Sequence, residues 1–421
     1  MSQYIIQNNK QNERWFSFLY GFFLIAIIID VGGAFGVKYL SFIILSLSLF
    51  LYILVNDRFS FSVNTIIIEG TLFIFIPLFF VCSSIIIYNV PIVNVVRGVL
   101  PFITWLLYPI LINIYPREKI VLIFKRTMFF AAIIILLSFL IIYLLYLMDK
   151  YNLIGEINLF VSNYRLGYIG GKNFGEINYR FVPNVYFGWS MMLITASVLF
   201  LKENKIKFFI VFLAAILTFS TAIIIFTIFA CIWAIFAESY SKKKYSYILK
   251  QIFTMIVFFV LFILILNCFG YGFIVHPIFE KVFSPLTSQS TSIKIGHIKS
   301  IIHIFVENPF ILLFGMGVGS DFYEIELGEI VVGGNTEVSH INFVRQFGIL
   351  YALVFFIYIF YLFLRLFKKG GTERLLSIGF IALFFSAGTN PLLISPIFFI
   401  VMVIARAYLE TTKIKYIQKI C

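Results

Sequence analysis

Residues 127–148 read TMFFAAIIILLSFLIIYLLYLM, and no charged side chain interrupts them. An α-helix rises about 1.5 Å per residue, so a helix of these 22 residues would be about 33 Å long. The hydrocarbon core of a lipid bilayer is about 30 Å thick. This stretch therefore predicts a helix that spans a membrane.

The same apolar bias extends over the whole chain. Of its 421 residues, 62% are apolar and only 12% are charged, whereas soluble domains average about 45–50% and about 25%. Backbone groups in lipid must be satisfied internally, which leaves only helices or a closed barrel. Barrel strands are short and alternate in polarity, and these runs are long and unbroken. We therefore expect an all-α fold, a polytopic bundle of transmembrane helices.

The apolar runs predict about twelve spans. Two runs are interpreted as pairs of short helices, with breaks at Ser220-Thr221 and at Gly388-Thr389-Asn390-Pro391. The predicted spans are 15–31, 38–55, 64–88, 91–115, 121–148, 184–201, 205–218, 221–238, 247–268, 341–366, 375–388 and 391–408.

These spans divide the chain into five parts. An N-terminal bundle of five spans (1–148) precedes a first long outer loop (149–183) and spans six to nine (184–268). A second long outer loop with an amphipathic helix (269–340) precedes the C-terminal spans and a tail (341–421). Loops of this length are uncommon unless they have a function, so we expect the function on the outer, periplasmic face.

The positive charge of the chain follows its topology. The net charge is +13, and 22 of the 32 lysines and arginines fall on one side of the predicted spans. Cytoplasmic loops carry such an excess, so both termini are predicted in the cytoplasm. The basic balance therefore does not indicate a nucleic-acid partner.

Several classes of site find no support in the sequence. The four cysteines show no metal-ligand spacing and no disulfide framework. No GxxxxGK[ST] or GxGxxG phosphate loop is present, so ATP-driven transport by this chain is not expected. No cleavable signal peptide is visible, and no cofactor or metal is predicted.

The second outer loop contains a stretch, 291–307, that predicts an amphipathic helix ended by Asn308-Pro309. Its polar face would hold Lys299, Ser300, His303 and Glu307. Lys294 falls on the opposite, apolar side, and His297 lies at the edge of that side. A cation on an apolar face needs an anionic partner, although a lysine can also reach solvent from such a position.

Two further motifs follow in the same loop. Gly315-Met-Gly-Val-Gly319 would let the backbone approach another segment closely, or would cradle an anion on its N–H groups. Glu337 and His340 are three residues apart before the tenth span, so an early helix start would place them on one face. A carboxylate and an imidazole are common acceptors of a hydroxyl proton. The alternative is an ordinary capped helix start.

Three arginines are candidates for binding an anion. Arg165 and Arg180 lie in the first outer loop, against the general charge bias, and Arg97 lies inside the fourth span near its outer end. Arginine binds phosphate through a planar, permanently charged group, and ionisable residues in spans are functional candidates. The alternatives are contact with lipid headgroups for the loop arginines and snorkelling to the interface for Arg97.

The order of these features resembles the superfamily of O-antigen polymerases and O-antigen ligases, over about residues 150–410. The matching features are Arg180-x-x-Pro-Asn184, the Ser220-Thr221 turn, a large outer loop with a basic helix start, Asn308-Pro309, Gly315-x-Gly317-x-Gly319, and Glu337 eleven residues before Gly348. Ligases usually have His-Asn where this chain has Glu337-Val338, whereas polymerases more often have an acidic residue there. Members of the superfamily usually have an arginine in this part of the loop helix, where this chain has Lys294 and His297.

The resemblance implies a metal-independent membrane glycosyltransferase of the bacterial cytoplasmic (inner) membrane. It would polymerise undecaprenyl-pyrophosphate-linked oligosaccharide repeat units into a surface polysaccharide. Glu337 or His340 would be the catalytic base, and the residues expected to bind the pyrophosphate or substrate are Arg180, Arg165, Lys294, His297 and Arg97.

The resemblance also implies partners and leaves alternatives. The partners would be membrane lipid, a chain-length regulator and a flippase of the same pathway. One alternative is a ligase that transfers the glycan to lipid A core. Another is a flippase or exporter of lipid-linked glycans, which would need charges along a central path through its spans.

Overall fold

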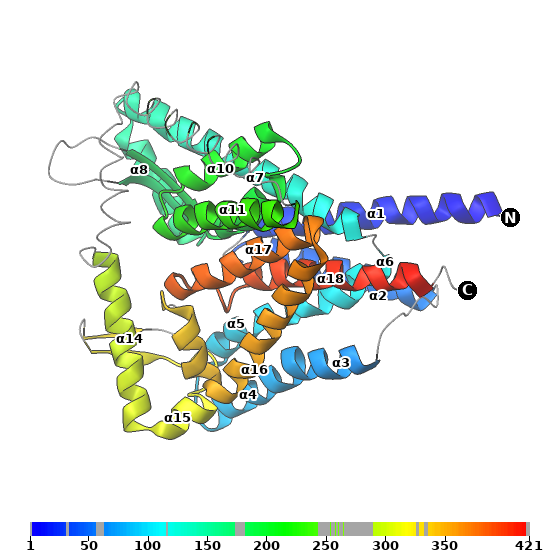
Figure 1. Ribbon diagram of the computed structural model, residues 1–421. Helices are drawn as coiled ribbons and strands as arrows, with labels where there is room; N and C mark the ends of the chain where they lie inside the picture. Colours follow the sequence, from blue (N-terminus) through cyan, green and yellow to red (C-terminus); the bar gives the residue numbers. More distant parts are fainter. Residues whose placement is uncertain are drawn as a thin grey trace.

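The computed structural model describes residues 2–30, 33–55, 63–114, 117–172, 182–242, 289–325, 328–331 and 336–417, and four single positions, Phe253, Val257, Val260 and Leu264. These residues form helices almost throughout, with two small two-stranded sheets (Figure 1). The all-α prediction is therefore confirmed at the level of fold class. Arg180 and most of the predicted span 247–268 lie outside the described residues.

The elements before the first sheet are α1 (Ser2–Ile29), α2 (Val37–Val55), α3 (Val63–Gly70), the π-helical turn η1 (Thr71–Phe75), α4 (Ile76–Ile86), α5 (Ile92–Ile103), the 3-10 turn η2 (Thr104–Leu106), α6 (Leu107–Ile114), α7 (Arg117–Leu147) and α8 (Tyr151–Asn163). The middle elements are β1 (Gly167–Lys172), β2 (Val182–Phe187), η3 (Gly188–Met191), α9 (Met192–Phe200), α10 (Lys205–Leu217) and α11 (Thr221–Lys242). The last elements are α14 (Gln289–Glu307), α15 (Pro309–Phe314), β3 (Phe322–Glu324), β4 (Glu329–Val331), α16 (Ser339–Lys369), α17 (Gly371–Ser386), η6 (Ala387–Thr389) and α18 (Pro396–Ile417).

Within the described residues, five helices are long and apolar enough to cross a membrane. They cover Ile67–Ile86, Ile92–Pro109, Glu118–Leu147, Thr221–Ser239 and Ser339–Lys369. Their outer surfaces remain apolar. On α7, for example, Leu137, Leu140 and Leu144 are each about half exposed. A helix that turns leucine stripes outward is unfavourable in water and stable in lipid, so the fold is that of a membrane protein.

The core lies around α9, α17 and α18. Every residue of α9 is buried, and α17 is buried along most of its length. A helix that is apolar on all sides belongs inside a protein. Gly379 of α17 lies against Thr195 of α9, where an added Cβ would be 2.7 Å from the Thr195 Cα atom. Small residues of this kind allow helices in membranes to pack closely.

Several predicted boundaries differ from the structure. The sixth predicted span begins at 184, but Val182–Phe187 is strand β2, which pairs antiparallel with β1, and the helix starts after it. The first outer loop is not a plain loop, because it contains α8 and β1. The last predicted span begins at 391, whereas α18 begins at Pro396 after a turn.

The face prediction for the amphipathic helix is partly wrong. Lys299 and His303 are exposed on α14 as expected, but Ser300 is buried. The Ser300 hydroxyl donates to the Gly296 carbonyl (2.9 Å) and accepts from the Ile325 N–H (3.0 Å). The end of the β3 segment therefore packs over Ser300, a residue that was expected to face solvent.

The two ends of the molecule differ in what they carry. Helix α1 begins and α18 ends at one end, whereas α8, the β1–β2 hairpin and α14 lie at the opposite end (Figure 1). Candidate site residues Arg165, Lys294 and His297 come from the segments at that opposite end. The fold therefore concentrates candidate chemistry away from the two chain termini.

Candidate functional site

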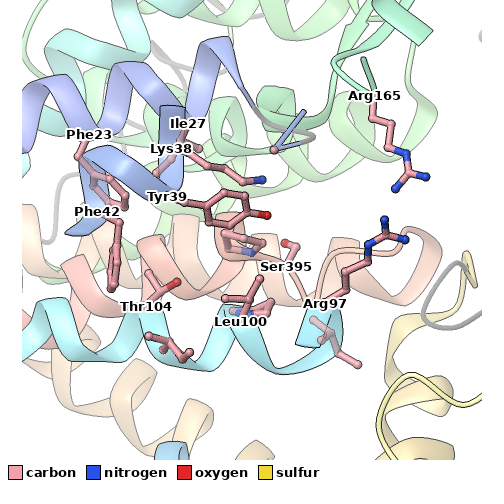
Figure 2. Close-up of a pocket in the computed structure, with 15 residues that line it drawn as sticks. Phe23, Ile27, Lys38, Tyr39, Phe42, Arg97, Leu100, Thr104, Arg165 and Ser395 are labelled. Atoms are coloured by element: carbon pink, nitrogen blue, oxygen red, sulfur yellow. The ribbon is translucent and has the colours of Figure 1, made fainter. Parts of the chain in front are cut away.

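Arg97 and Arg165 line one pocket of about 490 Å³. Figure 2 shows their guanidinium groups pointing toward each other, one from α5 and the other from the turn between α8 and β1. Both side chains are exposed, and among the described residues neither has an ion-pair partner. Two arginines in this arrangement attract an anion, because like charges gain from a shared counter-charge.

The turn after α8 positions Arg165. The Arg165 N–H bonds to the Ser162 carbonyl (2.9 Å) and the Leu166 N–H to the Val161 carbonyl (2.9 Å). Arg165 has φ 54°, the left-handed conformation that usually requires glycine. An arginine held in this conformation is unusual, and such strain is concentrated at functional sites.

Lys38 and Tyr39, at the start of α2, form another wall of the pocket. The Asp30 carboxylate accepts from the Phe35 N–H (3.1 Å) and the Lys38 N–H (3.4 Å), which fixes the α1–α2 turn. The Lys38 ammonium lies 5.0 Å from the centre of the Tyr39 ring. Nothing in the sequence pattern distinguishes Lys38, because it stands at the edge of an apolar run like many interfacial lysines.

A second group of charges surrounds Glu337. The Lys294 ammonium lies 3.4 Å from a Glu337 carboxylate oxygen, so the cation on the apolar side of α14 has the anionic partner that it needs. Burial and the Glu337 charge raise the pKa of Tyr186, on β2, to about 12. Burial lowers the pKa of His297, and the charges of Glu324 and Glu337 oppose that shift. Glu337 thus pairs with an ammonium, and its charge acts on the Tyr186 phenol and the His297 imidazole.

His340 faces a different environment. Its ring packs edge-on against Phe384 (centroids 4.6 Å apart) and Phe356 (5.7 Å). Its Nε2 atom is buried without a hydrogen-bond partner among the described residues. The predicted shared face of Glu337 and His340 is therefore not the arrangement observed, because Glu337 lies before the first residue of α16 and turns to Lys294.

Two links bring the pocket and the Glu337 group to the same end of the molecule. In the first hairpin, Tyr186 pairs with Tyr168, close after Arg165 in the chain. The Ser339 hydroxyl, two residues after Glu337, donates to the Asn390 carbonyl, and the same turn continues into residues 394–396 of the pocket wall. The pocket lined by Arg97 and Arg165 is thus linked to the Glu337 carboxylate through two short segments.

The glycine loop 315–319 is a packing element. Its N–H groups donate to the Arg345 and Gln346 carbonyls, the Ser84 hydroxyl and the Gln346 side chain. Gly319 has φ 73°, and an added Cβ would lie 2.5 Å from the backbone of Asn94. The structure therefore favours close backbone approach over the anion cradle.

Arg345 holds this loop in place. It is fully buried, and it donates to the Ser320 hydroxyl (2.9 Å), the Ser320 carbonyl (2.8 Å) and the Asn342 side chain (2.9 Å). Its guanidinium lies 4.7 Å from the centre of the Phe322 ring. A charge inside a predicted span is a signal that could have identified this residue.

Comparisons with known proteins assign no family to this chain. No protein-family model, no curated protein and no solved structure matches this chain.

Proposed function

We propose that this chain is a metal-independent membrane glycosyltransferase that polymerises lipid-pyrophosphate-linked oligosaccharide repeat units. In this proposal about twelve spans place both termini in the cytoplasm and the reaction on the outer face of the cytoplasmic membrane. The observation that carries the proposal is the pocket in which Arg97 and Arg165 face each other.

The pocket arginines would bind the pyrophosphate of the donor lipid. When the bond between the anomeric carbon and the pyrophosphate breaks, the electron pair leaves with the pyrophosphate, and negative charge grows there. Fixed cations stabilise developing charge because they need no reorganisation at the moment of reaction. Arg180, also predicted to bind this group, lies outside the described residues and stays a prediction.

Glu337 would be the general base. Its carboxylate would take the proton of an acceptor hydroxyl while that oxygen bonds to the anomeric carbon of the donor sugar. Lys294, 3.4 Å away, would hold the carboxylate in position rather than bind pyrophosphate. His340, packed between phenylalanines, would support the helix start and not exchange protons with substrate.

Reconstitution tests the proposal directly. Purified protein in liposomes that contain lipid-linked repeat units and lipid A core should convert the repeat units to a ladder of longer glycans on the same lipid. Products on lipid A core, and no ladder, would identify a ligase instead. Movement of a fluorescent lipid-linked unit across the bilayer without extension would identify a transporter.

One observation bears on the transporter alternative. Glu69 on α3 and Arg406 on α18 form a buried ion pair, Nε to Oε1 2.7 Å, and transporters carry charges inside their spans. The Trp105 indole N–H donates to the second Glu69 oxygen (3.3 Å). Because both charges already have enclosed protein partners, the pair fits an internal support better than a substrate path.

A further inference from the structure

Helix α15 has an entirely apolar sequence and no buried residue. Its residues Pro309–Phe314 read PFILLF. Phe310 is 70% exposed, and Leu313 and Phe314 are exposed as well. The helix lies in the segment predicted as the second outer loop, where contact with water was expected. Apolar side chains gathered in this way are unfavourable in water, so the surface of α15 needs an apolar partner.

The exposed apolar surface begins on the preceding helix. Ile302 and Val306, four residues apart on α14, lie on one side of that helix, and Val306 is 75% exposed. After the break at Asn308, the exposed Phe310 and Phe314 continue the surface on α15. These four apolar residues form the elbow between α14 and α15.

The backbone of the elbow is fixed against the spans. An added Cβ at Gly348 of α16 would lie 2.3 Å from the Leu313 carbonyl oxygen, so only a glycine allows this approach. The Tyr88 hydroxyl, just after α4, donates to the Gly315 carbonyl (3.0 Å). Helix α15 therefore packs on α16 and lies beside the end of α4 (Figure 1).

The adjacent surfaces of α4 and α16 belong to two helices that are long and apolar enough to cross a membrane. Phe79 and Ile86 of α4 are exposed, and so are Leu350 and Val354 of α16. Lipid covers such surfaces in a membrane protein. The apolar residues of the elbow prolong a surface that already faces lipid.

We propose that the elbow between α14 and α15 inserts into the bilayer, and that its partner is the acyl chains of the outer leaflet. The elbow is then a membrane-insertion surface in a segment that the sequence predicts as an outer loop. This surface depends on the membrane fold and not on the proposed polymerase reaction.

The polar side of α14 fits the same placement. Lys299 and His303, also four residues apart, are exposed on the side of the helix that adjoins Ile302 and Val306. Helices that lie in a membrane interface divide apolar from basic residues in this way. Figure 1 shows α14 running across the direction of α11 and α18, as expected of a helix along the membrane surface. The insertion therefore holds α14, which carries Lys294, at the level of the headgroups.

Photocrosslinking of the full-length protein tests this surface. p-Benzoylphenylalanine replaces Phe310 in protein reconstituted in nanodiscs of phosphatidylethanolamine and phosphatidylglycerol, and mass spectrometry identifies the adducts after illumination. We expect phospholipid adducts in a yield similar to that from the same label at Phe79, which is 68% exposed on the span α4. His303, exposed on the polar side of α14, is the matched control position and should give roughly tenfold less lipid adduct.

The products distinguish lipid from the other possible occupants. Adducts at position 310 that join two copies of the chain would identify a dimer contact, and adducts within one chain would identify internal packing. Either result would overturn the insertion, as would a lipid yield no higher than that at His303. The label at Val306 gives a second reading if the protein labelled at Phe310 does not fold. Lipid adducts there support the insertion, and a yield as low as that at His303 contradicts it.

Discussion

Two groups of charge in this protein have opposite surroundings. Glu69 and Arg406 join α3 to α18 and are 5% and 8% exposed, with Trp105 and the Tyr108 ring completing their enclosure. Arg97 and Arg165 line an open pocket, and among the described residues neither has an ion-pair partner.

We interpret the enclosed pair as a support of the fold, and under the proposed function the two pocket arginines bind a ligand. Removing one partner of an enclosed pair leaves the other charge buried and uncompensated, which costs stability. Removing an arginine from the open pocket relieves repulsion between like charges and costs little stability. Activity and stability should therefore respond in opposite ways to substitutions in the two regions.

Glu337→Gln should have the largest effect on activity. A positioned general base contributes about 10²–10⁴-fold, so the turnover of lipid-linked repeat units should fall by that order. Binding of inorganic pyrophosphate should remain, since the pocket arginines are unchanged. The matched control is His303→Ala, which breaks an exposed pair with Glu307 (3.4 Å) and should be nearly silent. Near wild-type turnover in Glu337→Gln would show that this carboxylate has a structural role and not a catalytic one.

Arg165→Ala should come next. One lost contact to developing charge is worth roughly 2.7–4 kcal/mol, a loss of 10²–10³ in kcat. Arg165→Lys should restore only part of it, because a lysine lacks the planar two-pronged donor. Kinetics with lipid-linked repeat units measure both. A lysine variant as active as the wild type would show that a point charge suffices.

Arg406→Gln should mainly reduce stability. The buried Glu69 carboxylate would lose its partner, at a cost of about 3–5 kcal/mol. The double variant Arg406→Gln with Glu69→Gln should be milder, since no buried charge remains. Thermal unfolding in detergent checks this order. A double variant that is less stable than the single one would contradict the interpretation as an ion pair.

The smallest effect should be the pH dependence that His297 confers. Burial lowers its pKa, so the folded state resists protonation of His297. Its contribution to stability is therefore present above the unfolded pKa of about 6.5 and is lost as pH falls. His297→Phe should flatten the decline of the unfolding midpoint below that pH. An unchanged pH profile would show that His297 does not titrate on unfolding.

Much of the fold could be predicted from the sequence, because apolar runs such as 121–148 have one stable state in lipid. The break between α10 and α11 could also be predicted, from Ser220-Thr221. Strand β2 could not be found, because Val182–Phe187 joins directly onto an apolar helix and its partner β1 is a glycine-rich segment. The burial of Ser300 depends on a contact with β3, which periodicity alone does not contain.

The sequence identified residues of the candidate site, but it did not show which of them lie together. Charge type and position identified Arg97, Arg165, Lys294 and Glu337. The pairing of Lys294 with Glu337 and of Arg97 with Arg165 arises from packing between segments far apart in the chain. The predicted partnership of Glu337 and His340 assumed that the helix begins before Glu337, whereas α16 begins at Ser339.

The most direct test of the account is the turnover of purified Arg97→Ala protein on lipid-linked repeat units, measured beside its unfolding midpoint. Our account predicts a loss of roughly 10²–10³ in turnover with an unfolding midpoint no lower than that of the wild type, because the arginine serves a ligand and not the fold. Wild-type turnover in the folded Arg97→Ala protein would contradict the assignment of this pocket as the pyrophosphate site.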